Sequence, residues 1–130
     1  MTDLPDEIRE QLAKPNPAVM ATLGKDGRPV TVATWYLLED DGTILLGLDA
    51  TRARLKHLQR DPRVSLTALA EDNWYTAISV QGRVGEIHDD EGLAQIDRLS
   101  RHYGGKPYPN RDSPRVYTHL TIERWHGWNA

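Results

Sequence analysis

Hydrophobic and polar residues follow a pattern along the chain that predicts mostly β structure. Six runs are rich in β-branched, aromatic or other apolar residues and are bounded by Gly, Pro, Asp or Asn, as is typical of strands joined by turns. These runs cover residues 18–23, 30–38, 43–48, 63–70, 75–87 and 115–128. Because short turn sequences separate the first three, we expect two successive hairpins and an antiparallel sheet.

Three segments have the spacing of short amphipathic helices. In residues 3–12 the apolar positions recur every four residues, and Pro15 and Pro17 would end the helix. A second helix is expected to begin at Thr51, as its N-cap, and to stop at the Asp61–Pro62 pair.

The third predicted helix lies within residues 89–105, with Asp89 or Asp90 as its cap and Gly104 as its stop. Its apolar stripe consists of Leu93, Ile96, Leu99 and Tyr103. This helix is expected to pack on the sheet shortly before the last strand.

One glycine interrupts an otherwise regular strand. Ile78, Val80 and Val84 share one face of the fifth run, and Gly82 falls on the same face, which indicates a bulge or a close backbone approach. The element count predicts a mainly β (α+β) fold: a six-stranded antiparallel barrel, closed or partly closed, with small flanking helices. We expect residues 1–130 to form one domain.

Composition narrows the class of protein. The 130 residues include 38% apolar and 27% charged residues, carry a formal charge of −3 and contain no cysteine. This charge argues against a general nucleic-acid binder, and no apolar run approaches the roughly 20 residues that a bilayer-spanning helix needs. The polar, acidic start is unlike a signal peptide, so we expect a cytoplasmic protein. The five histidines lack the pairing of a metal site, and none is expected.

The segment from Thr51 to Arg63 places five basic residues in an acidic chain. Arg52 and Arg54 would lie in the first helical turn, where the unpaired N–H groups and the positive end of the helix dipole disfavour cations. A bound anion would reverse that effect. Arg54 also lies four residues before Leu58, on or beside the buried stripe, where a guanidinium needs a partner.

Two interpretations of these charges remain open. Acidic side chains elsewhere in the chain could satisfy them, which would make the segment an ordinary solvated face. Alternatively, the helix start could bind an anionic ligand. Arg60 and Arg63 lie farther along and are interpreted as surface charges.

Four stretches, taken in order, resemble one known family. They are ATLGKDGRPVTVATWY, DDGTILLGLDATRARLKHLQRDPRVSL, VQGRVGEI and RVYTHLTIERWHGW, and they are spread over residues 21–128. The chain resembles the pyridoxamine-phosphate-oxidase-like, FMN-binding split-barrel superfamily, and within it the small members that use the deazaflavin coenzyme F-420. The resemblance implies a six-stranded split β-barrel that forms a homodimer, with the cofactor in a groove at the dimer interface. His57 stands where this family often has Asn.

The resemblance also implies how the cofactor is held. Its phosphate would be bound by Arg54, assisted by Arg52 and Lys56, with Thr51 donating from the helix start. The residues expected near the ring are Val32, Ala33, Thr34, Trp35, Tyr36, Gly47 and Leu48. Trp35 and Tyr36 are neighbours and point to opposite faces of a strand, so one is expected in the core and the other could flank a ring. Trp128, near the end of the chain, corresponds to a position that approaches the partner subunit's cofactor.

The function implied is that of an oxidoreductase. Reduced F-420 would deliver a hydride to an electron-poor acceptor such as a quinone or an enone. FMN is the alternative cofactor, and a protein that carries or senses the cofactor without turnover is a second alternative. Single-stranded nucleic-acid binding by a small aromatic barrel is disfavoured by the acidic charge. Tyr36 or solvent could supply the proton, and we assign no catalytic residue.

Overall fold

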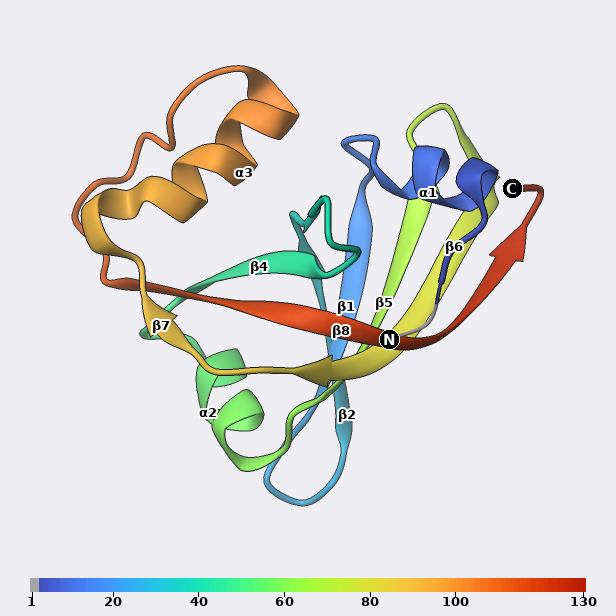
Figure 1. Cartoon of the computed structure of the whole chain (residues 1–130). Coiled ribbons are helices and arrows are strands. Elements are labelled where there is room, and N and C mark those ends of the chain that lie inside the picture. Colours follow the sequence, from blue (N-terminus) through green and yellow to red (C-terminus); the bar gives the residue numbers. More distant parts are fainter. Residues whose placement is uncertain (1–2) are drawn as a thin grey trace.

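An antiparallel sheet with short helices at its margins dominates residues 3–130, the part of the chain that the computed structural model describes (Figure 1). The strands are β1 (Ala18–Leu23), β2 (Pro29–Thr34), β3 (Leu37–Leu38), β4 (Ile44–Asp49), β5 (Arg63–Ala70), β6 (Asn73–Val84), β7 (His88–Asp89) and β8 (Arg115–Trp128). The helical segments are α1 (Asp6–Leu12), α2 (Ala53–Arg60), the single 3-10 turn η1 (Glu91–Leu93) and α3 (Ala94–Gly104). The predicted mainly β class is confirmed. Within residues 3–130, every helix is too short or too polar to cross a membrane.

The order of the strands explains the shape of the sheet. Neighbouring strands follow the order β2-β1-β5-β6-β8-β4-β3, and β7 pairs with β8. β2 and β3 lie at opposite ends of this order, although only Trp35 and Tyr36 separate them in the chain. The two ends of the sheet must therefore lie close together, which curls it into a half-barrel (Figure 1). The predicted strand over 30–38 is thus divided in two, and His88–Asp89 adds a short strand that the pattern did not predict.

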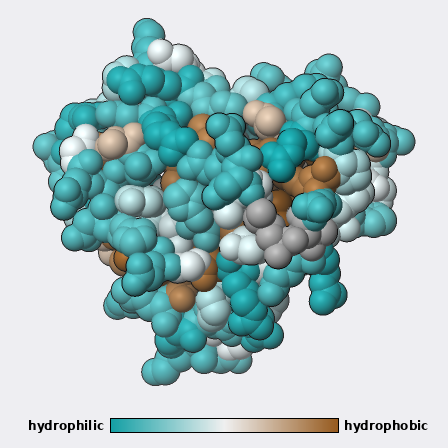
Figure 2. Space-filling model, in the orientation of Figure 1, coloured by the Kyte–Doolittle hydropathy of each residue, from teal (hydrophilic) through white to brown (hydrophobic). Residues whose placement is uncertain are grey.

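Buried side chains that alternate between the two faces of the strands form two separate hydrophobic cores. The inner face of β8 is buried through Val116, Thr118, Leu120 and Ile122. β4 is buried on both faces: Leu48 belongs to the main core, whereas Leu45 packs with Ile96 and Leu99 of α3. α3 therefore covers the outer face of β4. On the face shown in Figure 2, hydrophilic residues cover most of the surface and hydrophobic ones form smaller patches between them.

The start of α2 differs from the prediction. The helix begins at Ala53 with Arg52 at the N-cap position, and no side chain bonds to its first-turn amides. The predicted N-cap is wrong because the Thr51 side chain turns back: its Oγ1 donates to Asp49 Oδ1 at 2.7 Å, and its backbone N–H donates to the same oxygen at 2.9 Å. The first-turn amides of α2 are consequently left without a side-chain acceptor within residues 3–130.

The start of α3 was predicted more closely. The Asp90 carboxylate accepts the backbone N–H groups of Gln95 and Ile96 at 2.8 and 2.9 Å, so Asp90 caps the helix across the η1 turn, whereas Asp89 belongs to β7. At the other end Gly105 adopts the left-handed conformation, with φ 76°, one residue beyond the predicted stop.

Gly82 behaves as the pattern predicted. The pairing of β6 with β8 shifts register between Gln81 and Gly82. A Cβ at position 82 would lie 1.8 Å from the carbonyl oxygen of Thr121, so only glycine allows the two backbones to approach so closely.

Candidate functional site

A pocket of about 630 Å³ opens between α3 and the meeting ends of the sheet. Its polar and charged side chains come from segments far apart in the chain: Thr34, Arg54, Glu71, Tyr103, Tyr108 and Arg115. The rest of the lining is Pro15, Pro17, Ala18, Ala33, Trp35, Gly47, Ile96 and Leu99. The pocket thus combines an apolar and aromatic wall with two arginines.

Five residues predicted to contact a cofactor line this pocket. They are Ala33, Thr34, Trp35, Gly47 and Arg54. Gly47 lies on the α3 side of β4, where a Cβ would come within 3.0 Å of the Leu99 side chain, so glycine lets α3 approach the strand. Trp35 keeps 36% of its surface exposed, and its neighbour Tyr36 is fully buried, as their opposite orientations predicted.

The other predicted residues lie outside the pocket lining of the single chain. Leu48 of β4 and Tyr36 of the β2–β3 connection have no exposed surface, because both side chains lie in the main core. The remaining ones are half-buried or exposed: Val32, Thr51, Arg52, Lys56 and Trp128. Trp128 is 50% exposed at the end of β8, where its ring contacts His126.

Tyr36 has a structural role in the core. Its hydroxyl donates to the Leu12 carbonyl oxygen at 2.6 Å and accepts from Asn16 Nδ2 at 2.9 Å. Burial raises the pKa of Tyr36 well above its usual range. The hydroxyl is therefore neutral, bonded and turned away from the pocket, so it is not placed to give a proton to a ligand there.

Arg54 carries an unpaired buried donor. Its Nη1 is buried and has no hydrogen-bond partner within residues 3–130. Burial lowers the pKa of Arg54, the positive charges of Arg115 and Arg52 lower it further, and Asp49 acts in the opposite direction. The chain thus holds this guanidinium in an environment that a negatively charged group would improve.

The sequence patterns did not identify Arg115, Tyr103 and Tyr108 as site residues. The Trp35 and Tyr103 rings stack with centroids 5.4 Å apart, and Tyr108 meets Trp35 edge-on at 6.0 Å. The Arg115 guanidinium lies 5.1 Å from the centre of the Tyr108 ring. Tyr103 was visible as part of the apolar stripe of α3, but no local signal joined Arg115 to the site.

The loop after α3 is held against the helix by one carboxylate. Asp97 accepts from Arg111 Nη1 at 2.6 Å and from the Tyr108 backbone N–H at 3.0 Å. The Arg111 hydrogen bond is the main cause that lowers the pKa of Asp97. These bonds fix Tyr108, and with it the outer part of the aromatic wall.

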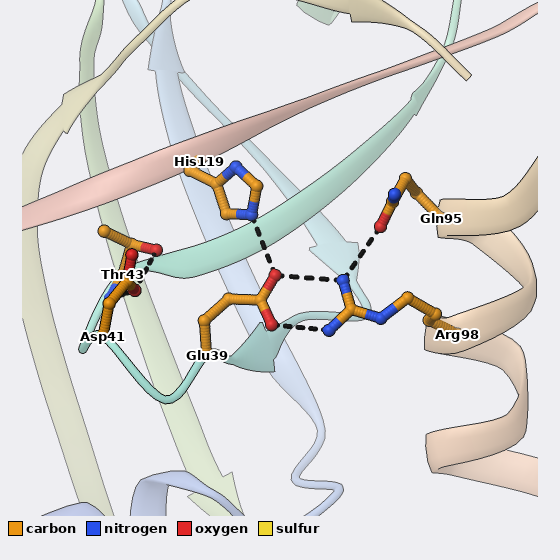
Figure 3. Close-up of polar contacts among 6 residues, drawn as sticks. All are labelled: Glu39, Asp41, Thr43, Gln95, Arg98 and His119. Carbon is orange, nitrogen blue, oxygen red and sulfur yellow. Dashed lines mark hydrogen bonds and ion pairs between the residues drawn. The ribbon is translucent and has the colours of Figure 1, made fainter. Parts of the chain in front are cut away.

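A second charged cluster fixes α3 from its other side (Figure 3). Glu39, in the turn between β3 and β4, accepts two hydrogen bonds from Arg98 of α3, at 2.5 and 3.0 Å. His119 Nε2 of β8 lies 2.9 Å from Glu39 Oε2, which also accepts from Arg98 Nη1, and Gln95 Oε1 accepts from Arg98 at 2.9 Å. The Arg98 hydrogen bond lowers the pKa of Glu39 most. The Glu39 cluster therefore connects α3 to the β3–β4 turn and to β8.

A second pocket of about 540 Å³ has a different electrostatic character. Its arginines include Arg63, which pairs with Asp61 at 2.8 Å, and Arg83, which lies 3.6 Å from Glu123. Arg63 is a paired surface charge, as its position beyond α2 predicted. Among residues 3–130, no group of three His, Asp or Glu side chains is placed to hold a metal ion.

Comparisons with known proteins agree on the fold. Residues 4–129 match the family model described as pyridoxamine 5'-phosphate oxidase. An F420 reductase is similar with a TM-score of 0.83 and 23% identity, over 95% of this chain and 98% of that chain. A conserved hypothetical protein from Mycobacterium tuberculosis is similar with a TM-score of 0.76 and 26% identity, over 98% and 86% of the two chains. A heme-binding protein from Mycobacterium smegmatis has a TM-score of 0.71 and 22% identity, over 99% of this chain and 57% of that one. The predicted split-barrel fold is confirmed.

Proposed function

The chain belongs to the pyridoxamine 5'-phosphate oxidase family, and from this premise we propose that it binds the deazaflavin coenzyme F-420 and uses it to reduce an electron-poor organic acceptor. The buried, unpaired Nη1 of Arg54 carries the proposal, because a phosphate at that corner would give it a partner. The similarity in fold to an F420 reductase lends further support.

The lining residues fit a phosphate-bearing ring. Arg54 and Arg115 make one part of the pocket cationic, and Trp35 presents partly exposed aromatic surface in another part. A flat ring suits the aromatic part and its phosphate the cationic part. Arg52, at the N-cap position of α2, and Lys56 of α2 are exposed, and in this proposal they contact the acidic tail of the coenzyme.

Each wall of the pocket has a role in the proposed reaction. Arg54 neutralises the phosphate and sets the position of the ring, and Trp35 with Ala33 limits how the ring lies. Ile96 and Leu99 of α3 offer apolar surface against which the ring can pack. When bound in its reduced form, F-420 supplies a hydride to the acceptor, and a proton must follow. Since Tyr36 is bonded within the core, solvent entering the pocket is the proposed proton source.

A homodimer forms part of the proposal. Trp128 is half-exposed and outside the pocket of its own chain, which leaves it available for the contact with the partner subunit's cofactor that the resemblance implies. Static light scattering of the purified protein is expected to give the mass of a dimer. A monomeric mass at assay concentration would remove Trp128 from the site.

Replacing Arg54 tests the proposal directly. Arg54→Ala is expected to weaken binding of F-420 by roughly 2–3 kcal/mol, the value of a charge-assisted hydrogen bond and its ion pair, with the fold intact. Arg60→Ala is the matched control, because Arg60 belongs to the same helix and is exposed outside the pocket. Fluorescence titration of both variants and the wild type with F-420 and FMN measures the affinities.

The titration also separates the alternatives. Tighter binding of FMN than of F-420 would favour an FMN-dependent oxidoreductase of the same fold. Tight binding of reduced F-420 without oxidation by any quinone or enone would favour a cofactor carrier. Equal affinity of the wild type and Arg54→Ala for both cofactors would contradict the assignment of the site.

A further inference from the structure

Arg115 resembles Arg54 in its surroundings, although it belongs to a different element. It is the first residue of β8, and it lines the same pocket as Arg54 of α2. Its Nε is buried and lacks a hydrogen-bond partner within residues 3–130, as does Nη1 of Arg54. Two arginines that line one cavity therefore each hold a buried nitrogen without a hydrogen-bond partner in this part of the chain.

The carboxylates near these arginines do not neutralise them. Asp49 is close enough to influence Arg54, but its Oδ1 accepts both hydrogen bonds from Thr51. Glu71 lines the same pocket, is exposed, and forms no ion pair with either arginine among the described residues. Apart from the exposed Glu71, the three guanidinium groups of Arg52, Arg54 and Arg115 and the Asp49 carboxylate leave two positive charges in excess around Arg54.

The orientation of Arg115 is fixed before any ligand arrives. Its guanidinium lies over the Tyr108 ring, and Tyr108 is held by its backbone N–H bond to Asp97. A ring contact uses the face of a guanidinium and leaves its in-plane N–H groups available for hydrogen bonds. Little side-chain entropy would then be lost when Arg115 binds an anion.

We propose that Arg115 is a second ligand of the anion bound by Arg54, and that this corner of the pocket selects ligand groups carrying two negative charges. This inference rests on the proposed function, because it concerns the same site. A phosphate monoester meets the requirement by itself, since it carries about −1.5 to −2 charges at pH 7. A phosphodiester carries a single charge, so it meets the requirement only when the same ligand has a carboxylate beside it. Arg115 is in this sense a specificity-determining residue.

The test compares ligands that differ in charge at this position. The protein variants are wild type, Arg115→Ala, Arg115→Lys, and Arg60→Ala as an exposed control outside the pocket. Dissociation constants for FMN, F-420 and riboflavin are measured by fluorescence, and inorganic phosphate is tested alone by its effect on the melting temperature. Melting curves without ligand establish that each variant is folded.

We expect Arg115→Ala to weaken FMN binding at least ~10-fold, as loss of a hydrogen bond to a charged group implies, with Arg115→Lys intermediate and Arg60→Ala unchanged. Riboflavin has no phosphate, so its affinity should be the same in wild type and Arg115→Ala. The stabilisation of the wild type by phosphate should be lost in Arg115→Ala.

Failure of the inference and failure of the proposed function give different results. If both cofactors bind wild type and Arg115→Ala equally, the role of Arg115 is overturned while the cofactor site stands. If neither cofactor binds the wild type, but phosphate still stabilises it through Arg115, the anion site stands without the proposed function. If phosphate and both cofactors leave the wild type unaffected, the inference is overturned. Should Arg115→Ala fail to fold, Arg115→Lys carries the same comparison.

Discussion

Two groups of arginines, one paired with carboxylates of α3 and its surroundings and one in the pocket, have contrasting environments. In the Glu39 cluster, Arg98 makes two hydrogen bonds to one carboxylate. Arg111, from the loop after α3, pairs with Asp97 of that helix. In the pocket, Arg54 and Arg115 have buried nitrogens without a partner in residues 3–130. Both groups come from an acidic chain with 19 Asp and Glu residues, so carboxylates are not scarce.

The contrast separates two uses of charge. A guanidinium that meets a carboxylate of its own chain stabilises the fold and has no donor to offer a ligand at that point. A guanidinium that is partly buried beside others of the same sign costs stability and becomes favourable when an anion binds. The position of the unpaired charges therefore supports the proposed binding site in the pocket, and the paired charges hold α3 in place.

The largest effect on stability is expected at Glu39. Glu39→Ala removes the partner of Arg98 and His119 and should lower the free energy of unfolding by roughly 1–2 kcal/mol, between the values of an exposed ion pair and a buried charged hydrogen bond. Urea unfolding of wild type and variant measures the change. Arg28→Ala serves as control, because its 3.5 Å pair with Asp26 is exposed and should contribute little. An effect at Glu39 no larger than that of the control would show that the cluster does not support α3.

A change of opposite sign is expected at Arg54. Arg54→Met keeps the length of the side chain and removes an unpaired, partly buried charge, so it should raise the free energy of unfolding of the ligand-free protein by about 1 kcal/mol. Arg98→Met removes a paired charge and should lower it. The measurement is urea unfolding in buffer without phosphate. If both variants are destabilised alike, the distinction between paired and unpaired arginines fails.

A smaller and pH-dependent effect follows from the lowered pKa of Glu39. A carboxyl whose pKa is lower in the folded than in the unfolded state contributes stability above its unfolded value, and that contribution is lost as pH falls through the folded value. The difference in unfolding free energy between wild type and Glu39→Gln should therefore shrink as pH falls below about 4.5, the ordinary value for Glu. A difference that stays constant down to pH 3 would contradict the linkage.

The candidate site was only partly visible in the sequence. Arg54 could be singled out because local spacing placed a charge beside Leu58 on the apolar stripe of α2. Trp35 and Tyr36 could be assigned to opposite faces by alternation, and the structure shows that Tyr36 is the buried one. Leu48 was expected near the ring from the resemblance alone, yet strand alternation turns it to the core while Gly47 faces α3.

The sequence by itself determined the positions of most strands and the close backbone approach at Gly82. It also led to the hypothesis that the start of α2 binds an anion. These features depend on residues close together in the chain, whose side-chain periodicity and backbone freedom are local properties. Only the tertiary structure decided that Thr51 turns to Asp49 and that Arg115 and Tyr108 join Arg54 and Trp35 in one pocket. Such meetings depend on how the sheet curls and where α3 packs, and contacts between distant segments leave no periodic signal in the chain.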